Sequence, residues 1–350
     1  MTASGGATYA GSGVDIAAGE RAVELMRAAV ARTAGPDVVG GIGGFAGLLD
    51  ASRISRMRRP LLATSTDGVG TKVVIAQQLG VYDTIGIDLV GMVVDDLVVC
   101  GAEPLFMTDY VVCGAVVPER VAAIVAGIAA GCVLAGCALL GGETAEHPGH
   151  FAADEFDLAG AATGVVEADQ LLGPHLVRAG DAVIALASSG LHANGFSLVR
   201  HILDRARLDF DDEPAELGRS LGTELMTPTR IYARDCLAIA QACEVRAFAH
   251  ITGGGVTANL ARVLPPHADA RLDRGSWNPP PVFGLLAGRG GVRRDEMERV
   301  FNMGIGMIAV VAPADADAVI SLLGHRGVTA WPLGEIVSGT GSAALAGAHA

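Results

Sequence analysis

The chain has 350 residues with a formal net charge of −13, and 51% of its residues are hydrophobic while 18% are charged. Such a chain can bury a large core in one or two domains, which excludes wholesale disorder. The negative charge disfavours a general binder of nucleic acid or of an anionic membrane, so we expect no nucleic acid and no membrane among its partners. Only 4% of the residues are aromatic and 48 are glycine, which predicts an aliphatic core with many turns.

The cysteines and the first residues indicate the compartment. None of the six cysteines forms a CxxC pair or lies beside a histidine cluster, which favours buried, reduced thiols over zinc or redox sites. Residues 1–13 lack the basic and apolar parts of an export signal, so we expect a cytoplasmic protein. Residues 121–142 are uncharged and long enough to span a bilayer. Because they are rich in alanine and glycine, and their first apolar residues recur with helical spacing, we predict a soluble helix followed by a strand.

In chain order, helices and strands are predicted to alternate along the first half. The helices are expected at 17–32, 83–102 and 118–136, and the strands at 60–66, 104–117, 137–143 and 156–167. Proline and two glycines at 171–181 mark a break. This break predicts an N-terminal domain at 1–170 and a C-terminal domain at 171–350.

The second half alternates more regularly. Strands are expected at 181–188, 246–252, 303–313 and 330–337, and helices at 194–206, 228–243, 314–327 and after the glycines at 253–255. Because both halves mix helices and strands, the predicted fold class is α/β or α+β.

Residues 64–72 read TSTDGVGTK, with an acidic residue at the start of a glycine turn that ends in lysine. The P-loop pattern fails, because a threonine separates Gly70 from Lys72 and no serine or threonine follows the lysine. The run GGIGGFAG at 40–47 fails the dinucleotide fingerprint, since its glycine spacing is wrong and no clear strand precedes it. This run is compatible both with a flexible loop and with a loop that faces phosphate.

Several acidic residues interrupt or end apolar segments: Asp67, Asp95, Asp96 and Glu143. Ionised carboxylates in such places are costly unless they are paired or bind a metal. Helix capping and salt bridges explain any one of them. As a group, they indicate oxygen ligands for a Mg²⁺ ion that is bound to a nucleoside triphosphate.

Two turns in the second half combine glycine with histidine. The segment SSGLHANGFSLVR at 188–200 contains His192, and AHITGGG at 249–255 puts His250 before a helix start that suits an anion. Each histidine is equally compatible with a structural role in its turn, with its hydrogen bonds satisfied inside the protein. Arg230 in TPTRIY is a phosphate clamp or part of an ordinary helix start. A hydrolase is disfavoured, because no GxSxG elbow and no acid partner is identifiable.

Taken together, these segments resemble the phosphoribosylformylglycinamidine cyclo-ligase (aminoimidazole ribonucleotide synthetase) family over nearly the whole chain. The shared segments occur in family order: YAGSGVDIAAGE, GGIGGFAGL, TDGVGTK, DTIGIDLV, DDLVVCGAEPLFMTDY, GGETAEHPG, SSGLHANGFSLVR, TPTRIYARD, AHITGGG and FNMGIGM. Each segment is weak alone, but the set is very specific.

The resemblance implies a reaction and an assembly. ATP would phosphorylate the formamide oxygen of formylglycinamidine ribonucleotide, and the amidine nitrogen of the same molecule would then close the ring. The products would be 5-aminoimidazole ribonucleotide, ADP and phosphate, in the fifth step of de novo purine synthesis. The implied fold is a two-domain PurM-like fold. Two copies would form a homodimer whose N-terminal domains share a β-barrel, with nucleotide near the interface and substrate between the domains.

The resemblance also implies roles for individual residues. The Mg²⁺ ligands would be Asp67, Asp96 and Glu143. The ATP site would contain these residues and Gly43, Gly44, Thr66, Gly68, Gly70 and Lys72. The substrate would contact Ser189, His192, Asn194, Gly195, Arg230, Gly253, Gly254 and Gly255. Catalysis would rest on Asp67 and on either His192 or His250 for proton transfer.

The sequence departs from the family pattern at Asp95, where asparagine is common, and this departure would add negative charge near the metal. His147 and His150 stand where methionine is common, and we assign them no role.

Related enzymes of the same fold are the alternatives. A selenophosphate synthetase would need an early cysteine, but the first is Cys100, and a hydrogenase-maturation relative would need a C-terminal cysteine, but the chain ends GAHA. A thiamine-monophosphate kinase would lack the pairing of GGETAEHPG with SSGLHANG. A non-catalytic nucleotide-binding regulator is a further alternative, which the retention of Asp67, Lys72, Asp96 and His250 disfavours.

Overall fold

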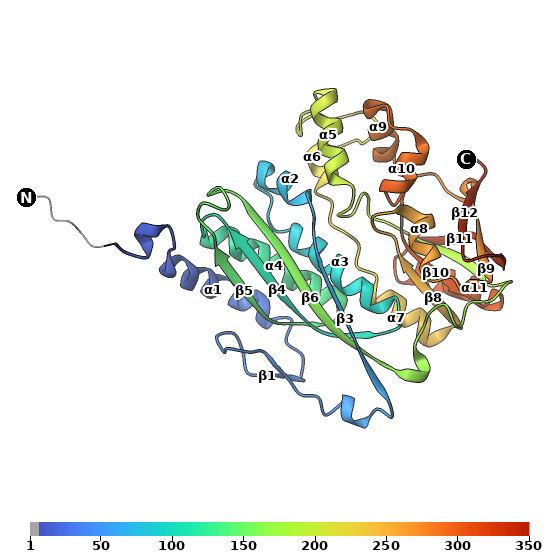
Figure 1. Ribbon diagram of the computed structural model, residues 1–350, viewed down its shortest axis with the longest axis horizontal. Coiled ribbons are helices and arrows are strands. Elements are labelled where there is room, and N and C mark those ends of the chain that lie inside the picture. The colour runs from blue at the N-terminus through green and yellow to red at the C-terminus, as the bar shows by residue number, and fades with distance from the viewer. Residues whose placement is uncertain (1–6, 350) are drawn as a thin grey trace, which may run out of the picture.

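The computed structural model of the chain describes residues 7–349 and contains two large β-sheets with helices packed against them (Figure 1). The first half forms a four-stranded sheet in the order β3-β6-β4-β5, in which β4 and β5 run parallel and the other neighbours antiparallel. Its strands are β3 (Pro60–Gly68), β4 (Glu103–Cys113), β5 (Ala138–Glu146) and β6 (Phe156–Glu167). A two-stranded ribbon of β1 (Val38–Val39) and β2 (Leu48–Leu49) precedes this sheet in the chain.

Helices α3 (Ile85–Val98) and α4 (Pro118–Ala135) pack on this sheet and on each other, and α1 (Ile16–Ala31) packs on α4 (Figure 1). The α4 helix begins with a proline, whose fixed φ suits the first turn, and is followed by Gly136 in the left-handed conformation. By length and composition it is the one helix in the described part of the chain that could cross a membrane. More than half of that apolar window is buried inside the fold.

The second half forms a six-stranded sheet in the order β12-β9-β11-β7-β10-β8, in which only β12 and β9 run parallel. Its strands are β7 (Ala182–Ala187), β8 (Val245–His250), β9 (Ala268–Asp273), β10 (Ile305–Val311), β11 (Ala330–Ser338) and β12 (Ala343–Ala346). Its longer helices are α5 (Phe196–Ala206), α7 (Ala233–Ala242), α8 (Gly255–Ala261), α9 (Pro281–Gly290), α10 (Arg294–Val300) and α11 (Ala316–His325). The helix α2 (Lys72–Leu79) of the first half and the short helix α6 (Leu221–Leu225) complete the α-helical elements of the described chain.

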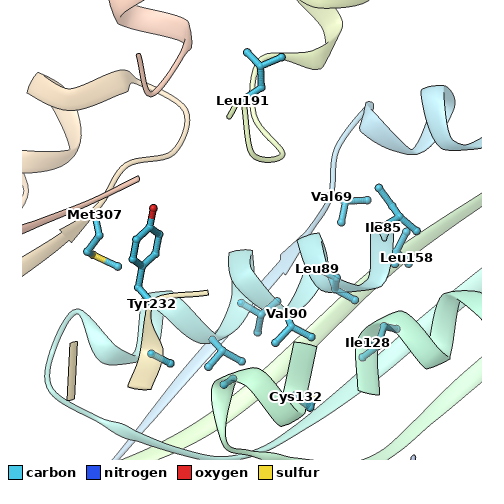
Figure 2. Packing of buried hydrophobic residues seen from close by; sticks show 14 of the residues in the cluster. Val69, Ile85, Leu89, Val90, Ile128, Cys132, Leu158, Leu191, Tyr232 and Met307 are labelled. Carbon is cyan, nitrogen blue, oxygen red and sulfur yellow. The ribbon is translucent and has the colours of Figure 1, made fainter. Parts of the chain in front are cut away.

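One hydrophobic cluster joins the two halves. Leu89 and Val90 of α3 belong to it together with Ile128 of α4 and with Tyr232 and Met307 of the second half (Figure 2). All five side chains are fully buried. Because burying one large apolar side chain stabilises a fold by roughly 1.5–3 kcal/mol, this shared core holds the two halves of the chain together.

The predicted fold class and most of the predicted elements are confirmed. The β6 strand has the predicted ends, and α4 ends one residue before the predicted 136. The helix expected at 228–243 begins only at Ala233, because the backbone N–H groups of Thr229 and Tyr232 donate to carboxylates of α3 instead of to a helix.

Further differences concern the end of one strand and elements that were not predicted. The strand expected at 104–117 ends at Cys113, and β9, α9 and α10 were not predicted at all. The connection between the two sheets follows Glu167 and reaches β7 at Ala182. The boundary between the domains at 170 and 171 stays a prediction.

Candidate active site

Helix α3 runs between the two halves and carries three aspartates that bond residues of the second half. Asp88 lies in its first turn, and Asp95 and Asp96 lie near its end. Asp88 and Asp95 are seven residues apart, which is about two helical turns and puts them on one face. Asp88 was not among the predicted site residues, although its spacing of seven residues from Asp95 is a signal in the sequence.

The last turn of α3 forms a partly exposed hydrogen-bonded pair with the end of β8. Asp96 Oδ1 lies 2.9 Å from His250 Nδ1, and the Asp96 side chain is 42% exposed whereas that of His250 is 2% exposed. An ionised carboxylate can only accept a hydrogen bond. The ring nitrogen that bonds to it, Nδ1, therefore carries a proton. The other ring nitrogen, Nε2, is buried and has no hydrogen-bond partner among residues 7–349.

Asp67 at the end of β3 belongs to the same cluster. Burial raises its pKa, the Gly68 N–H that donates to its Oδ1 at 2.7 Å lowers it, the Asp96 charge raises it and the charge of His250 lowers it. Asp67, Asp96 and His250 therefore come together from β3, α3 and β8. Gly70 makes the turn after β3 with φ of 56°, a left-handed conformation that favours glycine.

The first turn of α3 forms a sealed charged pair. Lys72 Nζ donates to Asp88 Oδ1 at 2.9 Å and to the backbone carbonyls of His192 at 3.0 Å and Thr227 at 2.8 Å. Both charged side chains are 0% exposed. All three ammonium protons are therefore used, and Lys72 does not face a nucleotide phosphate as the resemblance implied.

His192 lies beside this pair with its backbone at φ of 63°. Its Nε2 accepts a hydrogen bond from the Ser189 N–H at 3.2 Å, so the ring proton lies on Nδ1, which is buried without a partner. Burial lowers the pKa of His192 well below its usual range, and the charges of His250, Lys72 and Arg230 lower it further. The ring is thus a neutral hydrogen-bond donor, and the Ser189 hydroxyl is engaged by the carbonyl of Pro228 at 2.6 Å.

Two loops of the second half meet near these histidines. Asn194 Oδ1 accepts the Gly253 N–H at 3.1 Å, which ties SSGLHANG to the triple glycine. Gly254 and Gly255 both have positive φ, and a Cβ on Gly255 would lie 1.8 Å from the carbonyl oxygen of Glu298, so no other residue fits there. The Gly253 N–H is therefore already engaged, which reduces the N–H groups that this loop offers to an anion.

The remaining predicted substrate residues flank these loops. Gly195 precedes α5 with φ of 81°. Arg230 is half-buried and its Nη1 lies 3.5 Å from the Gly327 carbonyl.

A cavity lies in the N-terminal half, between α1 and the β4–β5 edge. This cavity of about 570 Å³ is lined by Gly43, Gly44, Asp109, Gly142 and Glu143, among others. Burial raises the pKa of Asp109 to about 7. A Cβ on Gly142 would lie 1.8 Å from Asp109 Oδ1, so the glycine makes room for this carboxyl group. The sequence signal for Asp109 was an aspartate inside the otherwise apolar segment PLFMTDYVV.

Strand pairing separates Glu143 from the other predicted metal ligands. Asp67 pairs with Gly160, Gly160 with Asp109, and Asp109 with Gly142, so one row crosses all four strands. Glu143 is the residue after Gly142 and points to the opposite face of the sheet. Thr66, which precedes Asp67 on β3, points to that opposite face as well.

The predicted three-ligand magnesium site is therefore not formed within one chain. Among residues 7–349, no group of three His, Cys, Asp or Glu side chains could hold a metal ion. Asp67 and Asp96 remain together, and their oxygens suit a hard cation, because Mg²⁺ is commonly held by one or two carboxylates with substrate phosphates and water.

Asp95 also departs from its expected place. It is fully buried, and both of its oxygens accept the Tyr232 N–H at 3.0 Å, just before α7. Burial raises its pKa to about 7. This residue stabilises the start of α7, and its side chain is sealed beneath the second half instead of lying open beside the Asp67 cluster.

Comparison with known proteins identifies the relatives of this chain. Two family models match it, the AIR synthase related protein N-terminal domain over residues 49–166 and the corresponding C-terminal domain over 178–346. A phosphoribosylformylglycinamidine cyclo-ligase from Geobacillus kaustophilus is 49% identical over 343 residues, covering 98% of this chain and 99% of the relative. The cyclo-ligase from Myxococcus xanthus is 49% identical over 97% of this chain and 98% of its own.

Solved structures share the fold at low identity. Thiamine-monophosphate kinase from Stenotrophomonas maltophilia superposes with a TM-score of 0.67 at 20% identity, covering 94% of this chain and 97% of the kinase. A hydrogenase maturation protein in complex with ATP superposes with a TM-score of 0.62 at 17% identity, covering 98% of this chain and 92% of that protein. These likenesses establish the fold alone, whereas the full-length identity to the cyclo-ligases establishes the family. This chain belongs to the phosphoribosylformylglycinamidine cyclo-ligase family.

Proposed function

We propose that this enzyme closes the imidazole ring of formylglycinamidine ribonucleotide with ATP and releases 5-aminoimidazole ribonucleotide, ADP and phosphate. The observation that carries the proposal is the 49% identity to a curated cyclo-ligase over 98% of this chain. ATP would transfer its terminal phosphoryl group to the formamide oxygen. The amidine nitrogen would then attack the activated carbon, phosphate would leave, and one nitrogen proton would have to be removed.

His250 is the group suited to take that proton. Its Nε2 has no partner among the described residues, and Asp96 holds a proton on Nδ1, so the neutral ring would offer its lone pair at Nε2. The Asp96 carboxylate would also stabilise the imidazolium that forms. His192 is unsuited to this step, because its Nε2 already accepts a hydrogen bond, and its Nδ1–H would instead donate to the substrate.

The nucleotide phosphates would lie at the end of β3. Asp67 and Asp96 would hold Mg²⁺, which supplies positive charge against the phosphates, since the protein itself is strongly acidic. The cavity beside Gly43, Gly44 and Asp109 lies along the same sheet row as Asp67 and would take another part of the nucleotide. Glu143 would contribute at this cavity and not at the metal.

The chain would act as a cytoplasmic homodimer. Helices pack on one face of the four-stranded sheet, while the other face presents Leu62 at 68% and Tyr110 at 39% exposure. Exposed apolar side chains on an uncovered sheet face favour pairing with a second copy. Sedimentation analysis of the purified protein tests this proposal, and a monomer at micromolar concentration would count against it.

The reaction is tested by incubating the enzyme with formylglycinamidine ribonucleotide, ATP and Mg²⁺ and measuring ADP release and aminoimidazole formation. Release of ADP that depends on the ribonucleotide is expected. Thiamine monophosphate in place of the ribonucleotide serves as the control for a kinase of the same fold. Absence of ribonucleotide-dependent ADP release would refute the proposed reaction.

The metal site is tested with Asp67→Asn. We expect at least a hundredfold loss of turnover at fixed Mg²⁺, partly recovered at higher Mg²⁺, with an unchanged oligomeric state. Calorimetric titration of Mg²⁺ with ADP measures the binding step without turnover. Unchanged turnover would remove Asp67 from the site.

A further inference from the structure

The sealed pair of Lys72 and Asp88 has no role in the reaction as described, yet it is built more elaborately than an ordinary salt bridge. Lys72 Nζ has three acceptors within 2.8–3.0 Å, and they belong to Asp88, His192 and Thr227. A neutral amine has only two N–H groups, so three acceptors identify an ammonium whose protons are all engaged. Two of the three bonds go to backbone carbonyls of the second half.

Asp88 extends the same network. Its Oδ1 accepts the Thr229 N–H at 2.8 Å and the Thr229 hydroxyl at 2.6 Å in addition to the Lys72 ammonium. Burial raises the pKa of Asp88 and lowers that of Lys72, and the attraction between the two opposes both shifts. The pair thus joins the starts of α2 and α3 to two backbone segments of the other domain.

These two segments border the substrate side of the site. The backbone of His192, whose carbonyl accepts from Lys72, is in the left-handed conformation. Residues other than glycine rarely adopt this conformation. The Thr227–Thr229 segment includes Pro228, whose carbonyl accepts the Ser189 hydroxyl. On the other side of the pair, Lys72 follows Asp67 by five residues through the Gly70 turn.

We propose that Lys72 and Asp88 are positioning residues, which fix the His192 backbone and the Thr227–Thr229 segment relative to the strand end that carries Asp67. Substrate-facing groups of one domain are thereby held against phosphate-facing groups of the other. An apolar pair of similar size could fill the same space, but it could not direct the His192 carbonyl or the Thr229 N–H. The expected loss of turnover rests on the proposed function, whereas the expected displacement of His192 does not.

The decisive variant is the double substitution Lys72→Met with Asp88→Asn, which removes both charges together and so leaves no unpaired buried ion. Its asparagine Oδ1 can still accept from Thr229, but the bonds to His192 and Thr227 are lost. We expect kcat to fall about 10–100-fold with the KM for ATP within about twofold, because the loss is one of alignment. We also expect the ¹⁵N signals of the His192 ring to shift while those of His250 stay.

Two further variants make the result interpretable. Arg246→Met removes another largely buried cation, paired with Asp181 and Glu244 at the start of β8 and away from His250 at its end. This control is expected to lower stability without lowering kcat. Thr229→Val removes only one hydroxyl bond and is expected to lower kcat severalfold with a smaller shift of the His192 signals.

Each outcome decides the proposal. Wild-type kcat in the double variant, unchanged His192 signals, or an equal kcat loss in Arg246→Met would overturn it. If the double variant fails to fold, Thr229→Val takes its place, and unchanged His192 signals there would overturn it too. If the wild-type enzyme shows no ribonucleotide-dependent ADP release, the proposed function fails, while the His192 signals still test the positioning.

Discussion

Two pairs of ionisable side chains join the domains along one helix, and they differ in their exposure to solvent. Lys72–Asp88 and His250–Asp96 both have contacts of 2.9 Å. In the first pair both side chains are 0% exposed and every ammonium proton is engaged. In the second, the Asp96 carboxylate is 42% exposed and His250 Nε2 has no partner. A buried charge is therefore not by itself a sign of chemistry, and what distinguishes the second pair is that one partner is exposed and can meet a ligand.

The largest effect is expected from breaking the sealed pair on one side only. Lys72→Met leaves the Asp88 carboxylate buried without its counter-charge, and such a loss costs about 3–5 kcal/mol of the free energy of unfolding. Urea unfolding at pH 7.5 measures it. Arg293→Met, which removes the exposed pair with Asp295, is the control and should leave the unfolding midpoint unchanged. Equal unfolding midpoints for the two variants would contradict the expected difference between the buried and the exposed pair.

The partly exposed pair is expected to control the rate. His250→Ala should lower kcat by at least about a hundredfold, in the range of a lost general base, with ADP affinity close to wild type. His325→Ala, on the surface of α11, is the matched control and should keep full activity. If nucleotide affinity falls as much as turnover, His250 has a structural role instead.

The neighbouring aspartates of α3 sharpen the contrast further. Asp96→Asn removes the negative charge beside His250, and we expect about a tenfold loss of kcat. Asp95→Asn keeps an oxygen that accepts the Tyr232 N–H and removes a carboxyl whose pKa is already raised to about 7, so activity should stay within about twofold. Steady-state kinetics on both variants checks this, and equal losses would mean that Asp95 also acts on the site.

The smallest expected effect is the contribution of His192 to the pH dependence of stability. The folded-state pKa of His192 is depressed by burial, so below its ordinary pKa of about 6.5 the unfolded chain binds a proton that the folded chain does not. Stability is therefore present above pH 6.5 and falls as the pH drops, by at most about 1.4 kcal/mol per pH unit. His192→Asn, which tolerates positive φ, should reduce this slope between pH 6.5 and 5.5 in urea unfolding. An identical slope in the variant would assign the pH dependence to other groups.

Much of the fold could be predicted, because periodic patterns are local. The alternation in FDLAGAATGVVE predicted β6 with both ends, and the proline and glycine that bound α4 predicted that helix to within a residue. The patterns failed where a partner distant in sequence decided the structure. The helix expected from 228 begins at Ala233, since Asp88 and Asp95 take the backbone N–H groups before it.

The sequence by itself determined the family and the chemistry of the site: the carboxylates, the histidines and the glycine turns are local motifs. Only the tertiary structure decided which of these groups keep free capacity. Lys72 is occupied by a carbonyl 120 residues away, and His250 is oriented by a carboxylate 154 residues away. The pleat of the sheet turned Glu143 away from Asp67, because successive residues of a strand face opposite sides. Such pairings depend on which segments pack together, and no local pattern encodes that.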